Sequence, residues 1–326
     1  LVHLMAQMLE PKAGETIYDP TCGTGGMLIS CLAEVKRNGG DTRTMGLFGQ
    51  ELINITAAIA RMNLVLHGVS DFDIRTGNTL HEPALISGDR LKTVDVVLAN
   101  PPYSIKKWNR EAWQSDPWGR NFLGTPPQGR ADYAFWQHII QSMKAKSGRC
   151  AILFPHGVLF RNEETAMREK LIAHDVVECV LGLGPNLFYN SPMEACVVIC
   201  RMSKPKARRN KALFINAVTE VTRERAQSFL TDDHIGRIVG AYQAFADEDG
   251  FARVAGNDEI REKGSNLSIP LYVRTNNGSG NGGVADDGVS LKQAIADWQQ
   301  SSTTLRESMS DLFEILEDAR AMGGGK

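Results

Sequence analysis

Asn100, Pro101, Pro102 and Tyr103 are the residues of this chain best suited to chemistry, and they directly follow an apolar run, residues 94–99. A Val- and Leu-rich run predicts a strand buried on both faces, and open α/β sheets bind ligands beyond the carboxyl ends of such strands. Two prolines cannot continue a strand ladder, so we expect a stiff turn. The turn offers an amide, carbonyl oxygens and an aromatic ring, which together suit a planar ring that bears an amine. The alternative is a strand that simply ends at two prolines and an ordinary loop tyrosine.

A second candidate is a glycine-rich turn, residues 19–26, between an expected strand at 16–19 and an expected helix at 27–35. Such a turn lets backbone amides approach a ligand closely at a helix N-terminus. The dinucleotide fingerprint is not met, because Leu28 stands where a third small residue is needed, and there is no Gly-Lys-Ser/Thr of a phosphate loop. An acidic residue followed by close glycines instead suits a cofactor with a positively charged amino-acid tail. The candidate contacts are Asp19, Thr21, Gly23, Thr24, Gly25 and Gly26.

Two further polar positions follow the next two expected strands, residues 45–49 and 72–76. Glu51 ends the first, where a carboxylate can accept both hydroxyls of a ribose. Alternatively, it is a charge favoured by the dipole of the following helix. Asn78 follows the second strand, and its amide could recognise an adenine edge or serve only the turn. Its neighbours Thr79 and Leu80 complete this candidate nucleotide site.

The elements that must hold these turns alternate between strand and helix. Beyond the tip we expect helices at 132–146, 163–173 and 232–245, and strands at 149–154, 176–183, 195–201 and 213–218. Such alternation predicts an α/β fold whose mostly parallel sheet is covered by helices on both faces. The segment between the strands at 176–183 and 195–201 has no helical period, so we expect these two strands to pair antiparallel at the sheet edge.

A long insert, residues 104–130, separates the tip from the next helix and has no clear periodicity. It mixes three tryptophans with an excess of cations, which would suit a nucleic-acid strand, with cations on phosphates and rings against bases. Alternatively, the tryptophans pack the insert onto its own domain. The candidate nucleic-acid contacts are Lys106, Lys107, Arg110, Arg120 and Arg130.

The composition limits the possible partners and location. A net charge of −2 and a pI near 6.4 do not mark a protein that grips nucleic acid by itself. The six cysteines lie mostly in apolar runs without a Cys-x-x-Cys pair, so we expect core residues of a reduced cytoplasmic protein and no metal site; Cys196 and Cys200 are weak alternatives as ligands. No apolar run approaches the roughly 20 residues that span a membrane. Because Leu1 falls within a helical pattern, we expect an upstream segment.

The last third of the chain contains two different kinds of segment. Residues 266–273 should be extended because of their Pro and β-branched content, and the Asn- and Gly-rich residues 275–288 should form a flexible linker. Beyond the linker, apolar residues recur in alternating steps of four and three, interrupted by Ser302, which predicts a helix with a heptad seam. That helix docks on a partner or, alternatively, folds back on its own domain. The seam residues expected to contact a partner are Leu291, Ile295, Trp298, Leu305, Met309, Leu312 and Leu316.

With these motifs in this order, the chain resembles the S-adenosylmethionine-dependent amino-methyltransferases of DNA. The glycine-rich turn, Asp132-Tyr-Ala-Phe135 and Asn266-Leu-Ser-Ile-Pro270 narrow the resemblance to the modification subunit of type I restriction–modification systems. The resemblance implies a Rossmann-like, mostly parallel seven-stranded sheet with a C-terminal helical tail. It also implies that the glycine turn holds the methionine part of the cofactor, Glu51 the ribose and Asn78 the adenine, while the Asn100–Tyr103 tip receives a flipped adenine.

The resemblance also implies a domain plan and a set of partners. The catalytic domain is expected at 1–218, an extension packed on it at 219–274, the linker at 275–288 and a partner-binding helix at 289–322. The expected partners are double-stranded DNA, a DNA-specificity subunit, a second modification subunit and a nuclease subunit. Family members carry a helical N-terminal domain, which we do not expect within residues 1–326. Two rival readings are methyl transfer to RNA or a protein glutamine, and a scaffold without catalysis.

Overall fold

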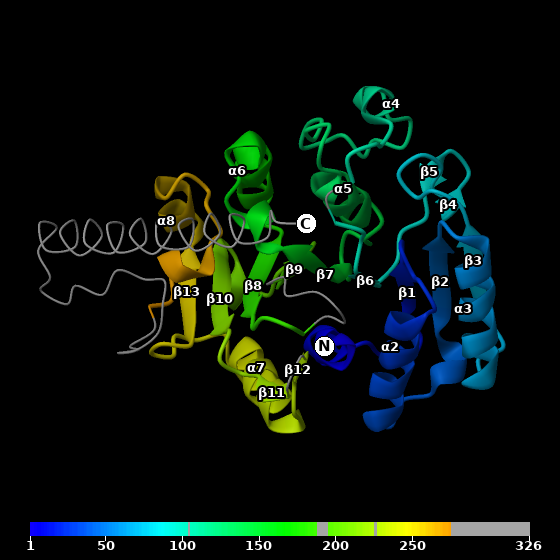
Figure 1. Cartoon of the computed structure of the whole chain (residues 1–326), viewed down its shortest axis with the longest axis horizontal. Helices are drawn as coiled ribbons and strands as arrows, with labels where there is room; N and C mark the ends of the chain where they lie inside the picture. The colour runs from blue at the N-terminus through cyan, green and yellow to red at the C-terminus, as the bar shows by residue number, and fades with distance from the viewer. Residues whose placement is uncertain (104, 188–194, 225–226, 275–326) are drawn as a thin grey trace, which may run out of the picture. The chain divides into compact units, whose positions relative to one another are not determined.

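A computed structural model describes residues 1–274 except 104, 188–194 and 225–226. The expected linker and heptad helix, residues 275–322, lie outside the described residues and stay predictions. The described part is built on one nine-stranded sheet with the strand order β13-β10-β8-β9-β7-β6-β1-β2-β3 (Figure 1). The predicted α/β class is confirmed, but the expected count of seven strands is wrong, because β10 and β13 extend the sheet beyond β8.

The first half of the sheet consists of short parallel strands. They are β1 (Thr16–Asp19), β2 (Gly46–Glu51), β3 (Phe72–Thr76) and β6 (Val96–Ala99). All four residues of β6 are buried, and alternate ones join opposite cores, Val96 and Leu98 on one face and Val97 and Ala99 on the other. A strand covered on both faces reads as a continuous apolar run, which explains why β6 was recognisable from the sequence.

The second half adds mostly longer strands, and two of its strands run opposite to the rest of the sheet. Its strands are β7 (Arg149–Pro155), β8 (Val177–Leu183), β9 (Ala195–Arg201), β10 (Lys211–Ala217) and β13 (Ala252–Gly256). β9 runs antiparallel to both β7 and β8 and lies between them, while β10 is parallel to β8. The predicted antiparallel pairing of β8 and β9 is confirmed, but their expected place at the sheet edge is wrong, since β10 and β13 lie beyond them.

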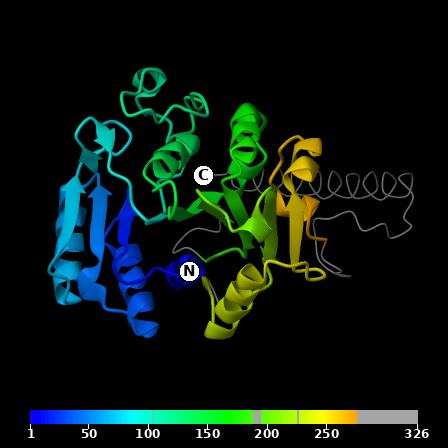
Figure 2. The ribbon, with the colours of Figure 1, turned by 180° about the vertical axis from the view of Figure 1, so that it is seen from behind.

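Helices cover both faces of the sheet, as Figures 1 and 2 show from opposite sides. One face carries α1 (Val2–Leu9), α2 (Gly26–Arg37), α3 (Asn54–Leu66) and α7 (Asp232–Ala244). The other carries α5 (Asp132–Gln141), α6 (Thr165–Ala173) and α8 (Asn257–Glu262). The short α4 (Arg110–Gln114) lies in the insert. Two small antiparallel sheets pair β4 (Ile86–Ser87) with β5 (Arg90–Leu91) and β11 (Thr222–Glu224) with β12 (Gln227–Phe229).

Two local sequence signals are informative about where elements begin and end. Thr231, directly before the helix expected at 232–245, caps α7 by accepting the backbone N–H of His234. Residues 266–273 were expected to be extended, and this is wrong, because Ile269–Leu271 form a 3-10 turn with a proline in its first turn. That turn lies against the sheet, where Tyr272 stacks on Phe214 with ring centroids 3.8 Å apart. All six cysteines are buried as free thiols, which confirms their assignment to the core.

Candidate active site

The tip that follows β6 places its polar groups at the surface. Asn100 and Pro102 are exposed, Pro101 is buried and Tyr103 is half-buried. The Tyr103 hydroxyl donates a hydrogen bond to the side-chain oxygen of Asn100 across 2.9 Å. Burial raises the pKa of Tyr103, so its hydroxyl stays protonated and remains a donor at neutral pH. The tip thus presents an amide oxygen whose orientation is set by the neighbouring phenol.

The glycine-rich turn follows β1, directly beside β6 in the sheet. Gly23 and Gly25 have φ values of 53° and 85°, which L residues with side chains adopt only at a cost. Gly25 also precedes the first residue of α2, whose start has no side-chain cap. The uncapped amides at the start of a twelve-residue helix therefore meet the turn, an arrangement suited to a bound acceptor group.

Asp19, at the end of β1, is the most perturbed carboxyl of this edge. It is 2% exposed, and its side chain accepts the backbone N–H of Thr21 across 3.0 Å. Burial, with a smaller contribution from nearby Glu51, raises the pKa of Asp19 from 3.8 to about 7. A buried acid that titrates near neutrality would be ionised by a cation placed beside it, so Asp19 is suited to a positively charged ligand group.

Glu51 is the last residue of β2 and links this strand end to the glycine-rich turn. One of its carboxylate oxygens accepts the N–H of Gly23 and the other the N–H of Ile53, each across 3.0 Å. Glu51 thus lies before the first turn of α3, which begins at Asn54, rather than within it. Leu52 and Ile53, which sequence reasoning missed, are 63% and 55% exposed and offer an apolar surface beside this carboxylate. Their sequence position could have indicated this surface, because two large apolar residues directly follow the acidic end of a strand.

The turn after β3 is tied down by its own side chains. The Asn78 side-chain oxygen accepts the backbone N–H groups of Leu80 and His81 across 3.0 and 3.3 Å. Thr79 is buried, and its hydroxyl donates to the carbonyl of Pro20 across 2.6 Å. The side-chain oxygen of Asn78 therefore serves the turn, while Thr79 and the buried side chain of Leu80 hold it in place.

The described part of the insert contains one short helix, α4, and packs against the rest of the domain. Trp113 in α4 is buried and packs with Leu80 and Phe135, as the alternative reading of the tryptophans proposed. Arg120, expected to contact nucleic acid, is 1% exposed and forms an ion pair with Asp116 across 2.6 Å. The prediction that Arg120 contacts nucleic acid is wrong, because its guanidinium is buried. Breaking such a buried ion pair to reach a phosphate would cost about 3–5 kcal/mol.

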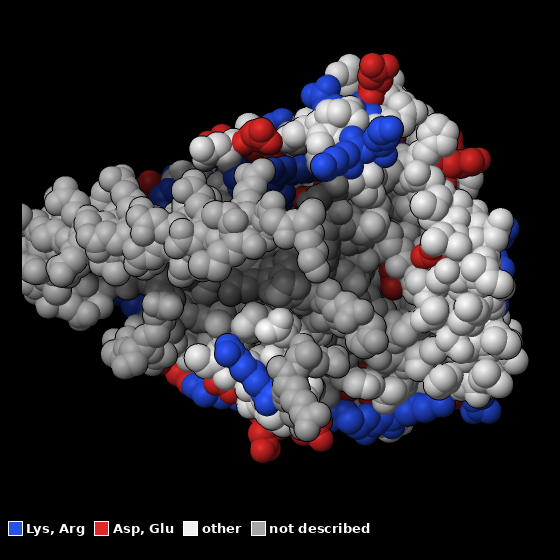
Figure 3. Space-filling view, viewed as in Figure 1, with Lys and Arg blue, Asp and Glu red and all other residues white. Residues whose placement is uncertain are grey.

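The other candidate nucleic-acid contacts of the insert differ in exposure. Lys106 and Lys107 are exposed, whereas Arg110 and Arg130 are partly buried and Arg110 donates to the carbonyl of Pro126. Basic side chains lie over the region of α4 and α5 in Figure 3. A cavity of about 470 Å³ separates the insert from the Asn78 turn and is lined by both.

A further polar cluster lies close enough to the tip for Asp132 to help raise the pKa of Tyr103, and sequence reasoning did not identify it as a cluster. Arg161 bridges the carboxylates of Asp132 and Glu164 across 2.6 and 2.8 Å, and burial raises the pKa of Glu164 to about 7. His156 follows β7, the other parallel neighbour of β6, and its Nε2 lies 2.9 Å from the carbonyl of Ala195. The predicted strand at 149–154 could have drawn attention to His156, because it ends at the same edge.

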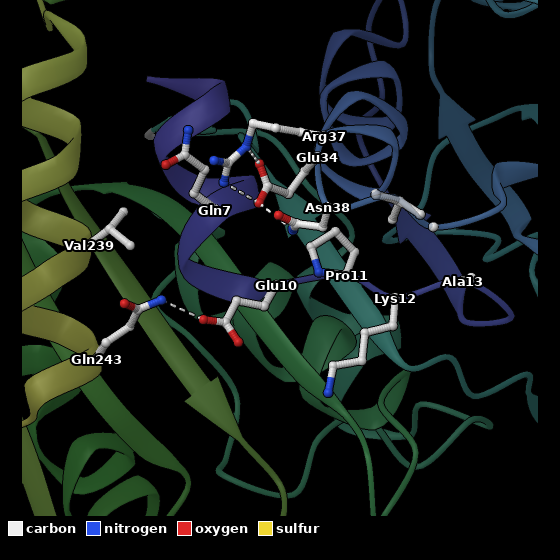
Figure 4. A pocket seen from close by; sticks show the side chains of 12 residues that line it. Gln7, Glu10, Pro11, Lys12, Ala13, Glu34, Arg37, Asn38, Val239 and Gln243 are labelled. Carbon is white, nitrogen blue, oxygen red and sulfur yellow. Dashed lines mark hydrogen bonds and ion pairs between the residues drawn. The ribbon is translucent and has the colours of Figure 1, made fainter.

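A second polar cavity, of about 410 Å³, lies among α1, the end of α2 and α7 (Figure 4). Several of its polar side chains bond with one another, since Gln243 donates to Glu10, and Arg37 and Asn38 donate to Glu34. It lies near the segments that precede β1 and β2, and hence at the opposite strand ends from Asn100. In the described part of the chain, no group of acidic, His and Cys side chains could hold a metal, and no helix is long and apolar enough to span a membrane.

Comparison with known proteins places the chain in a family. The model of the family described as "N-6 DNA Methylase" matches residues 1–280. The methylase subunit of the type I restriction enzyme MjaVII from Methanocaldococcus jannaschii is 34% identical over 285 residues, which cover 84% of this chain and 48% of that protein. The corresponding HindI subunit from Haemophilus influenzae is 29% identical and is matched over 100% of this chain and 71% of its own length.

A solved structure agrees with these relatives. The methyltransferase subunit of a type I restriction–modification system from Streptococcus thermophilus superposes with a TM-score of 0.77 at 35% identity, over 83% of this chain and 58% of that one. The chain thus spans about half the length of several of the curated relatives it matches.

Proposed function

Because this chain belongs to the N-6 DNA methylase family and resembles methylase subunits of type I restriction enzymes, we propose that it methylates the exocyclic N6 of an adenine flipped out of DNA, with S-adenosylmethionine as the methyl donor. The observation that carries the proposal is the common position of four polar segments. They follow β6, β1, β2 and β3, which are adjacent parallel strands, so all four meet at one sheet edge.

The residues at this edge fit S-adenosylmethionine, which supplies a methyl group already activated by a positive sulfur. Gly23 and Gly25 let the backbone approach the methionine part, and Asp19 would face its ammonium group. The Glu51 carboxylate would accept the ribose hydroxyls with the lone pairs that its two backbone donors leave free.

The adenine of the cofactor would meet a mixed surface. The Asn78 oxygen is used by the turn, so its NH₂ group is what remains to donate to a ring nitrogen. Leu52 and Ile53 would cover a face of the ring, since they are large, apolar and exposed at this position. Thr79 and Leu80 were expected to contact the cofactor. We propose instead that these two buried residues support the turn that carries Asn78.

The acceptor adenine must leave the base stack before its amine can reach the tip. Its exocyclic nitrogen is a poor nucleophile, because the lone pair is delocalised into the ring. If the Asn100 side-chain oxygen and the Pro101 carbonyl accept the two amine hydrogens, the lone pair is freed toward the methyl donor. The ring of Tyr103 would stack on the base, and Pro102 would keep the turn stiff.

We further propose that the chain acts within a complex. Lys106, Lys107, Arg110 and Arg130 would contact DNA phosphates. The heptad helix expected at 289–322 would bind a DNA-specificity subunit, and a second copy and a nuclease subunit would complete the assembly in the cytoplasm. The likeness to type I methylase subunits supports this arrangement.

Methyl incorporation tests the proposal. The chain is incubated with tritium-labelled S-adenosylmethionine and DNA, RNA or protein, with and without co-expressed partner subunits. Label in DNA that is recovered as N6-methyladenine would support the proposal. Label in RNA or protein alone would favour the first rival function, and no label under any condition would favour a scaffold.

A further inference from the structure

Arg120 is buried within the insert, although a charged residue in a loop-rich segment is expected at the surface. Two of its nitrogens, Nη2 and Nε, lie 2.6 and 2.9 Å from the Oδ1 atom of Asp116. Its guanidinium carbon lies 4.6 Å from the ring centre of Trp113 and 4.9 Å from that of Trp118. The guanidinium is therefore held in one orientation by a carboxylate and two aromatic rings.

The same guanidinium also reaches out of the insert. Its Nη1 donates to the carbonyl of Thr79 and its Nη2 to the carbonyl of Leu80, both across 2.9 Å. These carbonyls belong to the turn that carries Asn78. Arg120 thus bonds at once to the insert and to a segment about forty residues earlier in the chain, across buried contacts.

The bonds continue from this turn into the glycine-rich turn. The Thr79 hydroxyl donates to the carbonyl of Pro20, the residue after Asp19. Arg120 Nη1 also lies 3.5 Å from the ring of His138, whose other nitrogen is 3.1 Å from the hydroxyl of Tyr18. A continuous set of contacts therefore joins the insert, the Asn78 turn and the end of β1.

We infer that Arg120 is a positioning residue that fixes the Asn78 turn against the insert and so couples cofactor binding to the placement of the insert. The part that concerns the cofactor rests on the proposed function. The planar fork of Arg120 reaches two carbonyls and a carboxylate from separate nitrogens, whereas the three donors of a lysine ammonium all sit on one nitrogen and cannot span these acceptors in the same way. The residue acts through the turn and does not itself touch substrate.

Hydrogen exchange of the full chain without ligand tests the positioning role. In Arg120→Lys and Arg120→Met, we expect faster exchange of the amides of residues 77–82 and 105–130 together, with those of β10 and β13 unchanged. Arg110→Met is the matched control, since the side-chain bond of Arg110 stays within the insert. Unchanged exchange of residues 77–82 in a folded Arg120→Lys protein would overturn the inference, and this variant decides if Arg120→Met does not fold.

Titration with S-adenosylhomocysteine tests the coupling. We expect the dissociation constant of Arg120→Lys to rise roughly tenfold, within the range of typical coupling between sites. In the wild type, the ligand should slow exchange both in residues 77–82 and in the insert, whereas in Arg120→Lys it should slow only the former. Equal protection of the insert in both proteins would contradict the coupling. If the wild type binds no S-adenosylhomocysteine, the proposed cofactor is wrong, and the ligand-free exchange alone decides the role of Arg120.

Discussion

The two halves of the candidate site differ in the number of hydrogen bonds that hold their segments in place. In the proposed cofactor half, which comprises residues 19–26, 51 and 77–82, each segment is bonded to the next. Gly23 donates to Glu51, Thr79 donates to Pro20, and the backbone N–H of Gly77 donates to the carbonyl of Glu51 across 2.9 Å. In the proposed acceptor half, residues 100–103, the side chains make one hydrogen bond to other described residues, from Tyr103 to Asn100, and it is exposed.

Under the proposed function, this difference predicts that one half determines cofactor affinity and the other the rate of methyl transfer. A cofactor site that is already formed does not need to be ordered when the ligand binds, so its affinity depends on fixed carboxylates and amides. An acceptor tip with few internal contacts can adapt to a base that arrives from DNA and is positioned largely by that base. Changes in the first half should therefore affect binding, and changes in the second should affect the rate of transfer.

The largest expected effect is that of Asn100→Ala on methyl transfer. Because the amide oxygen would accept an amine hydrogen in the transition state, its loss should lower the rate on the order of 10²–10³-fold, as for other preorganised groups of this kind. Calorimetry should find the affinity for S-adenosylhomocysteine nearly unchanged. Asn38→Ala, at the opposite strand ends, is the control and should change neither. Equal losses of rate and of affinity would contradict the division between the halves.

Glu51→Gln should produce the second largest effect, and on binding instead of rate. Glutamine has one acceptor oxygen, so it cannot serve both Gly23 and Ile53 and also lacks the charge expected to hold a ribose. Loss of about 1.5–3 kcal/mol for a charged hydrogen bond corresponds to roughly a 10–100-fold weaker affinity for S-adenosylhomocysteine. The rate at saturating cofactor should change little, and Glu111→Gln in α4 serves as the control. A fall in rate with unchanged affinity would reverse the assignment of the two halves.

The strand ends of the candidate site could be predicted from the sequence because the signals are local. An apolar run that stops at a proline, a glycine or a carboxylate indicates where a strand ends, and alternation with helices places successive carboxyl ends at one edge. Asp19, Glu51 and Asn100 were located in this way. The strand order was not predictable, since β8 and β9 are both apolar and nothing local indicates that β9 lies between β7 and β8.

The roles of individual side chains were harder to predict when they depend on distant partners. β13 has the short sequence Ala-Arg-Val-Ala-Gly, with a single β-branched residue, and is recognised as a strand only through its antiparallel pairing with β10. A charged side chain is expected at the surface, and the burial of Arg120 follows from carbonyls about forty residues away. The spacing of Asp116 and Arg120 by four residues, flanked by tryptophans, was the available local hint.

Cofactor binding should also depend on pH, through Asp19 of the proposed cofactor half. This effect should be smaller than those of Asn100→Ala and Glu51→Gln. The free protein has Asp19 with a pKa of about 7, whereas the bound form should need it ionised beside an ammonium. At pH 6 most molecules must first lose a proton, so affinity for S-adenosylhomocysteine should rise roughly tenfold from pH 6 to pH 8. Asp19→Asn should bind more weakly and without this dependence. An equal slope in both proteins would exclude Asp19 as the titrating group.

The same carboxyl should influence stability in a defined direction. Its folded pKa lies above the usual value of 3.8, so between about pH 4 and 7 the unfolded chain is ionised at Asp19 while the folded one is not, and folding is progressively disfavoured as pH rises. Relative to the wild type, Asp19→Asn should therefore gain free energy of unfolding from pH 4 to pH 8, which urea denaturation at both pH values would measure. A constant difference would indicate that burial does not shift this group.

Tyr103→Phe should have the smallest effect, and it tests how loosely the acceptor half is held. Phenylalanine keeps the ring that would stack on the base and removes only the donor to the Asn100 oxygen. A net hydrogen bond of about 0.5–1.5 kcal/mol predicts a rate of transfer lower by roughly 2–10-fold, with unchanged affinity for S-adenosylhomocysteine. Tyr272→Phe, which removes a hydroxyl that donates to the carbonyl of Asn266 away from the tip, is the matched control.

Because the Asn100 oxygen has two lone pairs, it can accept from Tyr103 and from the amine at once, so the hydroxyl should orient the amide without blocking it. A faster variant would mean that Tyr103 competes with the amine, and a loss as large as that of Asn100→Ala would mean that the tip is preorganised as firmly as the cofactor half.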